Sequence, residues 1–220
     1  MTSTNPEAAP ADAPQKSKTT HTERMQSVQP VLEQLFTLYP HLFGAEFLPL
    51  KRGIFQDLLE KHPDVFKRDS LKAALGVHTR STRYLQCVAA GKQRHDLQGL
   101  AVEDVAPEHV YAAVVELFRR RQMRTQDDLR PQLRTQLMAA YEASGLSRDE
   151  YVSRTQSNDA QLSAVLEEAL EQSEQKLARQ AALLKAFEGS GKTVEAFAEM
   201  YGLKPRDVKA ALARKHSPSS

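Results

Sequence analysis

The sequence predicts a mainly α-helical protein with one small β-hairpin. Apolar residues recur at helical spacing in long segments from about residue 27 onward, and Pro or Gly separates these segments. Residues 92–98 differ, because they lie between Gly91 and Gly99 and mix polar and apolar side chains without a helical period. That pattern favours a short strand or one arm of a hairpin. The 220 residues suffice for one or two domains.

Turn and capping residues set the order of the expected helices. Pro40 and Gly76 end the first and third helices, Thr79 or Ser81 caps the fourth, and Pro107 opens the fifth. We expect helices over about 27–39, from 54 to about 62, over 71–75, after the cap at 79 or 81, from 107 to about 121, over 129–142 and over 162–187.

Positive charge is concentrated in one part of the chain. Residues 51–94 hold ten Lys or Arg against four acidic residues, whereas the whole chain holds 30 against 28. Residues 125–220 carry 13 basic and 14 acidic residues. A local basic surface indicates a polyanionic partner such as nucleic acid.

The sequence lacks the residues that several classes of protein require. No apolar run approaches the length of a membrane span and residues 1–22 have no signal-peptide centre, so we expect a cytoplasmic protein without membrane contact. Cys87 is the single cysteine, and we expect it to fill core space. Histidines at metal-ligand spacing are absent, and residues 189–193 lack the first glycine of a phosphate-binding loop. We therefore expect no catalytic residue, no metal, no cofactor and no enzymatic activity.

The C-terminal half contains a weak internal repeat. Residues 141–145 (YEASG) and 149–151 (DEY) resemble residues 187–191 (FEGSG) and 195–197 (EAF), at an offset of 46 residues. The repeat indicates a duplicated helical element. Residues 193–213 also match the spacing of a helix-turn-helix, for which a plain helical hairpin that turns at Gly202 is the alternative.

The start of the fourth helix has the chemistry of an anion site. Free amide N–H groups and the positive end of the helix dipole meet there. The Thr79 and Ser81 hydroxyls can hold a terminal phosphodiester or a 3′-hydroxyl, and Tyr84 offers a ring for stacking. The residues alone favour Tyr84 as a core aromatic. Asp96 is expected to form an ion pair or a turn hydrogen bond with Arg94 or with a backbone amide.

Five ordered segments resemble the ProQ/FinO domain of bacterial RNA-binding proteins. They are 39–43 (YPHLF), 49–58 (PLKRGIFQDL), 71–75 (LKAAL), 81–85 (STRYL) and 94–99 (RHDLQG). The resemblance covers about residues 29–121. It implies a multihelical ProQ/FinO-like domain with a small β-hairpin, followed here by a helical C-terminal extension.

The resemblance further implies an RNA chaperone that binds structured RNA, especially an intrinsic-terminator hairpin with a single-stranded 3′ U-tail, in small-RNA-based regulation. The expected partners are small RNAs and mRNA 3′ ends. By the family pattern, the 3′ end enters a pocket formed by His78, Thr79, Arg80, Ser81, Arg83 and Tyr84, and the hairpin phosphates follow a face formed by Lys51, Arg68, Lys72 and Arg94. By the resemblance, Tyr84 is instead expected to lie at the RNA-binding surface.

Three positions depart from the family pattern. Gly76 replaces a basic residue of some relatives, Thr82 an aromatic one and His78 a frequent tyrosine. If His78 lines the pocket, it would add positive charge below about pH 6.5.

We expect three regions: a disordered N-terminal arm at 1–24, the ProQ/FinO-like domain at 25–124, and a helical extension at 125–220 with the helix-turn-helix-like hairpin at 193–213. Two alternatives remain: a DNA-binding regulator that acts through this hairpin, and a helical scaffold that binds no nucleic acid. The basic block disfavours the scaffold.

Overall fold

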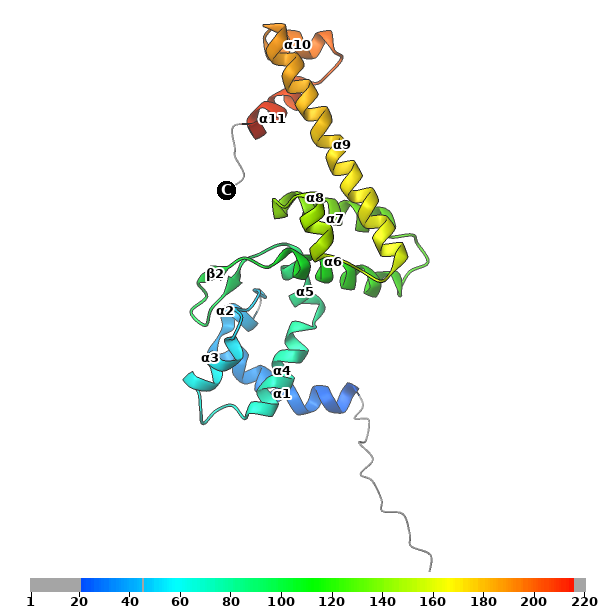
Figure 1. The fold of residues 1–220 in the computed structure, drawn as a ribbon. Helices are drawn as coiled ribbons and strands as arrows, with labels where there is room; N and C mark the ends of the chain where they lie inside the picture. Colours follow the sequence, from blue (N-terminus) through cyan, green and yellow to red (C-terminus); the bar gives the residue numbers. More distant parts are fainter. Residues whose placement is uncertain (1–20, 45, 216–220) are drawn as a thin grey trace, which may run out of the picture.

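The computed structural model describes residues 21–44 and 46–215, which form a helical molecule with one two-stranded sheet (Figure 1). The helices of these residues are α1 (His21–Leu38), α2 (Pro40–Phe43), α3 (Ile54–Lys61), α4 (Arg68–Thr79), α5 (Thr82–Ala89), α6 (Pro107–Gln122), α7 (Arg130–Ser144), α8 (Arg148–Arg154), α9 (Ala160–Ser190), α10 (Val194–Met200) and α11 (Pro205–Lys215). Strands β1 (Arg94–His95) and β2 (Ala101–Glu103) pair antiparallel between α5 and α6. The predicted fold class is confirmed.

The first hydrophobic core joins α1–α5 to the near side of α6. Its fully buried side chains include Leu35, Leu42, Leu58 and Leu71. Cys87 also lies in this core, where burial raises its pKa to about 11, as expected of a thiol that acts as apolar filler.

The hairpin rests against an extended segment that precedes α3. The His95 N–H donates to the Pro49 carbonyl at 2.7 Å, and the Lys51 N–H donates to the His95 carbonyl at 2.9 Å. In the hairpin turn, the Asp96 carboxylate accepts the N–H groups of Gln98 and Leu100. The expected strand at 92–98 is therefore confirmed, and Asp96 has the turn-forming role expected of it.

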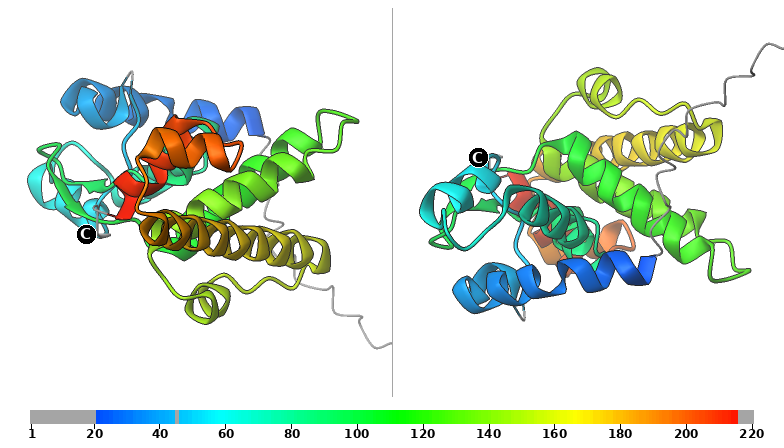
Figure 2. Two further views of the ribbon diagram at one scale, coloured as in Figure 1. Left: turned by 90° about the horizontal axis from the view of Figure 1, so that it is seen from above. Right: turned by 90° about the horizontal axis from the view of Figure 1, so that it is seen from below.

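Helix α6 contributes to two cores. Val110 and Ala113 belong to the first core, whereas Tyr111, Val114 and Val115 pack into a second core with α7, α8 and the start of α9. Figure 2 shows α6 between α1 and α8, which lie on opposite sides of the molecule. The extension therefore packs directly against the last helix of the basic domain.

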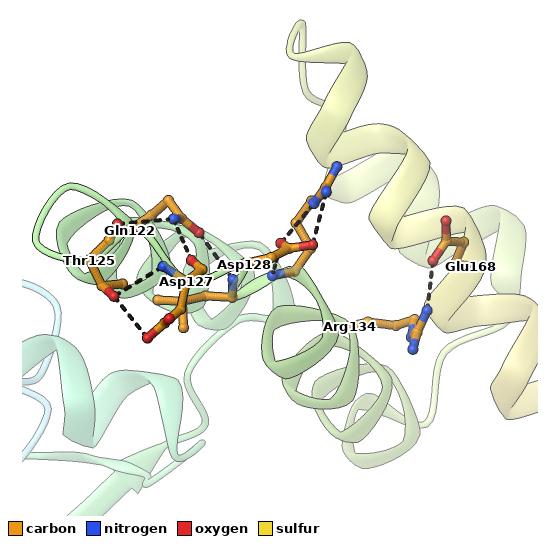
Figure 3. Close-up of polar contacts among 8 residues, drawn as sticks. Gln122, Thr125, Asp127, Asp128, Arg134 and Glu168 are labelled. Carbon is orange, nitrogen blue, oxygen red and sulfur yellow. Dashed lines mark hydrogen bonds and ion pairs between the residues drawn. The ribbon is translucent and has the colours of Figure 1, made fainter.

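The connection from α6 to α7 is held by side-chain hydrogen bonds (Figure 3). The Gln122 amide nitrogen donates to the Asp127 carbonyl at 2.8 Å, and its oxygen accepts the Leu129 N–H at 3.1 Å. Beyond this turn, the Arg134 guanidinium of α7 pairs with Glu168 of α9 at 2.9 Å. These contacts fix the direction in which α9 leaves the second core.

Helix α9 extends from the second core to a third, smaller core at the C-terminal end (Figure 1). Its 31 residues span about 45 Å. Phe197, Ala198 and Val208 of α10 and α11 are buried against its last turns. Among the described residues, no helix has the length and apolarity needed to cross a membrane.

Several helix boundaries differ from the predicted ones. Helix α4 continues past Gly76 to Thr79, because Leu75 and His78 are buried and favour continuation of the helix. Gly189 lies inside α9, and Gly191 ends that helix in the left-handed conformation, with φ 59°. Helix α1 begins at His21, so the last four residues of the expected arm are helical. Residues 1–20 of that arm lie outside the described residues.

The second core should tolerate little loss of volume. Leu137 is fully buried there, so Leu137→Ala should lower the free energy of unfolding by about 2–5 kcal/mol in chemical denaturation followed by circular dichroism. Leu177→Ala is the matched control, because that side chain on α9 is 54% exposed, and it should change stability by less than about 0.5 kcal/mol. Equal effects of the two variants would contradict this packing.

Candidate nucleic-acid interface

The N-terminal end of α5 lies at its junction with α4, and we call this end the helix mouth. Ser81 is extended, and its hydroxyl oxygen accepts the Tyr84 N–H at 3.2 Å as the N-cap of α5. Of the two predicted caps, Ser81 is therefore the one used. The Thr79 hydroxyl donates to the Leu75 carbonyl at 2.8 Å, inside α4. The remaining first-turn amides of α5 and its positive dipole end face this junction, which is a suitable place for an anion.

A hollow opens beside the junction, between α1 and the end of α4. Its volume is about 490 Å³, and Phe43, Phe47, His78 and Ser81 are among the residues that line it. Phe36 of α1, which is 53% exposed, forms part of the rim. Apolar rings and the Ser81 hydroxyl thus lie next to the helix mouth, a combination that suits a sugar and a base at a nucleic-acid end. Glu33 and Thr37 of α1 also line the hollow.

His78 is a buried aromatic member of this hollow. Its ring centroid lies 4.7 Å from that of Phe43, 4.5 Å from that of Phe47 and 5.3 Å from that of Tyr84. Burial lowers its pKa from 6.5 to about 4. The expectation that His78 gains positive charge below about pH 6.5 is therefore wrong. Among the described residues, its Nε2 atom has no hydrogen-bond partner.

Two arginines flank the mouth. The Arg83 guanidinium lies 4.6 Å from the centroid of the Phe47 ring, which holds it at the rim of the hollow by a cation–π contact. The Arg80 guanidinium lies over Gly76, where an added Cβ would come within 3.2 Å of a guanidinium nitrogen. Glycine at 76 thus leaves room for the Arg80 guanidinium.

An exposed row of cations follows one side of α4. Arg68, Lys72 and Arg80 are spaced at four-residue steps that pass through Gly76, so they lie along one ridge of the helix. Arg68 also contacts the Phe55 ring, at 5.4 Å from its centroid. This row leads to the helix mouth and presents positive charge to solvent, as a phosphate-tracking surface requires.

Tyr84 does not lie at the surface. Its side chain is 6% exposed, and its hydroxyl oxygen accepts the Leu50 N–H at 3.0 Å. Tyr84 is thus packed as the core aromatic that the residues alone favoured, and its contact with RNA stays a prediction. The sequence did not identify the Leu50 partner, because it lies 34 residues away.

Arg94 and Lys51 are engaged in structural contacts. Arg94, whose side chain is 13% exposed, donates to the Leu50 carbonyl at 3.0 Å and lies 3.2 Å from His109 Nδ1. Lys51 pairs with Asp57 at 2.8 Å, and this hydrogen bond raises the pKa of the lysine. Arg94 thus stabilises the hairpin, and Lys51 is the more accessible of the two.

Two contributors to the site were not among the predicted residues. Phe47 forms both the wall of the hollow and the support for Arg83. Arg120 of α6 donates to the Arg80 carbonyl at 2.9 Å and to the Thr82 hydroxyl at 3.3 Å, so it fixes the junction from outside. The basic run at residues 119–121 was evident in the sequence. The contact of Arg120 with Arg80, 40 residues earlier, could not be predicted because it depends on tertiary packing. No group of His, Cys, Asp or Glu suited to a metal occurs among the residues that the structure describes.

Comparison with known proteins agrees with the geometry. The model of the ProQ/FINO family matches residues 25–130. The RNA chaperone ProQ of Shewanella pealeana is 41% identical over 100 residues, which cover 44% of this chain and 47% of the relative. The RNA chaperone ProQ of Aeromonas salmonicida is 37% identical over 94 residues, which cover 41% and 45%.

One solved structure, a FinO-like RNA chaperone from Neisseria meningitidis MC58, is 28% identical, with 40% of this chain and 90% of that chain covered and a TM-score of 0.37. The chain spans slightly less than half the length of the two curated relatives. The family match, the identity to its curated members and the ordered motifs together show that residues 25–130, slightly less than half of this chain, are similar to the ProQ/FINO family.

Proposed function

We propose that this protein is an RNA chaperone that binds structured RNA through the α4–α5 junction. The observation that carries the proposal is the meeting of a capped helix mouth, the hollow beside it and exposed arginines at one place. The Ser81 cap and the first-turn amides suit the terminal phosphodiester, and Phe47 and His78 suit the last sugar or base. The proteins that share this domain at 37–41% identity are RNA chaperones by name, which supports the same activity here.

The preferred RNA in this proposal is an intrinsic-terminator hairpin with a single-stranded 3′ U-tail. The row formed by Arg68, Lys72 and Arg80 would follow the hairpin phosphates toward the mouth, where the free end is received. Such contacts give affinity with little sequence reading, so selectivity comes from RNA shape and from the free end. Small RNAs and mRNA 3′ ends carry such structures, which places the proposed role in post-transcriptional regulation.

The chemistry of the RNA end tests this proposal. The full chain should bind a terminator hairpin with a 3′-hydroxyl U-tail more tightly than the same hairpin with a 3′-phosphate or without a tail. The reason is that the mouth accommodates a diester and a hydroxyl but not an added terminal dianion beside apolar rings. Filter binding at one fixed salt concentration measures the three affinities. Equal affinities would overturn the 3′-end site.

Arg83 should contribute directly to affinity. Arg83→Ala removes a cation at the rim of the hollow, and it should weaken binding of the tailed hairpin about tenfold, or about 1.4 kcal/mol. Arg154→Ala is the matched control, because Arg154 is an exposed arginine on α8 and is not part of the α4–α5 junction. Circular dichroism checks that both variants are folded. A folded Arg83→Ala variant with wild-type affinity would remove Arg83 from the site.

His78 should act as a neutral group, and its burial makes stability depend on pH. An unfolded histidine titrates near pH 6.5, whereas His78 titrates at about 4 in the folded protein. As the pH falls through this window, only the unfolded state takes up this proton, so the free energy of unfolding decreases by up to about 3 kcal/mol. The His78→Gln variant has no histidine at this position, so its free energy of unfolding does not decrease for this reason. Its stability difference from wild type should therefore narrow between pH 7 and pH 4.5 in denaturant titrations, whereas a constant difference would contradict the assignment.

A further inference from the structure

The C-terminal extension contains two copies of one three-helix module. The first module, residues 130–169, consists of α7, α8 and the start of α9; the second module, residues 176–215, consists of the end of α9, α10 and α11. The two copies correspond without a gap at an offset of 46 residues. Gly145 and Gly191 both end the leading helix with positive φ, and Ser147 and Thr193 both cap the next helix.

Interior contacts repeat at the same offset. The Tyr141 and Tyr151 rings pack edge to face at 5.2 Å, and the Phe187 and Phe197 rings do so at 5.3 Å. The second ring of each pair is fully buried. The last serine of each leading helix donates to the carbonyl three residues earlier, at 2.7 Å in both copies. The predicted repeat is thus a structural duplication.

The two modules differ in what covers them. Tyr111, Val114 and Val115 of α6 pack against the first module. The connection between its second and third helices is held by an ion pair of Asp159 with Arg119 of α6, at 3.2 Å. In the second module, the hydrophobic core that includes Phe197 and Val208 comes from α9, α10 and α11 alone among the described residues. Its corresponding connection faces solvent at the far end of α9 (Figure 1).

The two modules also differ in net charge. The first module has four basic and six acidic residues, whereas the second has nine basic and four acidic residues. Pro205 stands where the first module has Asp159, between the exposed cations Lys204 and Arg206. The covered copy is therefore acidic overall and the uncovered copy is basic.

The connection between α10 and α11 combines cations with an aromatic ring. Tyr201 is 55% exposed, and one part of its ring packs against Phe197 at 4.6 Å between centroids, which fixes its orientation. Among the described residues, Lys204 has no ion-pair partner. Within the part of the chain that the structure describes, the ion-pair partner of Arg206 is the adjacent Asp207, at 3.6 Å and with both side chains largely exposed, so this contact contributes little free energy. Both cations are therefore available to a polyanion.

We propose that this connection, Tyr201–Arg206, is a second RNA contact, which binds single-stranded RNA outside the hairpin held at the α4–α5 junction. Lys204 and Arg206 would neutralise backbone phosphates, and the open part of the Tyr201 ring would stack on an unpaired base. The proposal rests on the proposed function. Helix α9 separates the two contacts, so only an RNA that extends well beyond the hairpin reaches both.

The test compares a bare terminator hairpin with the same hairpin carrying a long single-stranded 5′ extension. The wild-type chain should bind the extended RNA about tenfold more tightly. In the full chain, Lys204→Ala with Arg206→Ala should abolish this gain and leave the bare hairpin unaffected. The slope of log affinity against log salt for the extended RNA should fall by about 0.7 for each phosphate that the variant no longer neutralises. Tyr201→Ala should lose part of the gain that Tyr201→Phe retains.

Matched controls separate the possible failures. Arg206→Ala and Arg154→Ala each remove one exposed arginine, from the second and first module respectively, and only the former should reduce the gain. A gain that is absent in wild type, or unchanged in the variants, overturns the second contact while the 3′-end site stands. Failure of wild type to bind even the bare tailed hairpin overturns the proposed function itself. Displacement of the extension by duplex DNA at equal concentration would assign the connection to DNA instead.

Discussion

The double-sided burial of α6 is the constraint on which the rest of the structure depends. Val110 and Ala113 pack into the first core, and Tyr111, Val114 and Val115 pack into the second. An amphipathic helix with one apolar stripe could serve only one of these cores. Because α6 serves both, the position of the first module is set by the basic domain, and the direction of α9 follows from that position. The location of the second module, which begins at residue 176 within α9, is therefore determined by this one helix.

The same helix also stabilises the candidate site. Arg120 near its C-terminal end donates to the Arg80 carbonyl and the Thr82 hydroxyl, on either side of the Ser81 cap. The backbone at the mouth is thus held from within by capping and from outside by α6. A site that is built before its ligand arrives loses less entropy on binding. The adaptable parts of the interface are then the long cationic side chains, which suits a partner recognised by its phosphates.

The sequence predicted features that depend on local chemistry and missed those that depend on distant partners. The Ser81 cap, the strand between Gly91 and Gly99 and the helix opened by Pro107 follow from nearby residues, and all three are present. The Leu50 N–H donates to the Tyr84 hydroxyl and Arg94 donates to the Leu50 carbonyl, and the sequence identified neither contact because the partners lie 34 and 44 residues apart. The family resemblance assigned both residues to the RNA site, and that assignment stays a prediction. Tertiary packing determines how exposed these residues are. Their exposure decides whether they can contact RNA directly or only stabilise the fold around the site.

The overall composition of the extension conceals the difference between the two copies, because the acidic first module and four acidic residues outside both modules offset the positive charge of the second module in the net charge of residues 125–220. A module that packs against α6 needs an apolar surface and an acid for Arg119, as Asp159 provides. A copy without that neighbour has no such requirement, and an uncovered surface that kept only apolar residues would favour aggregation. Cations at the corresponding connection keep the uncovered copy hydrated. They also give it the charge of the cationic row on α4, so both ends of the molecule attract the same class of partner.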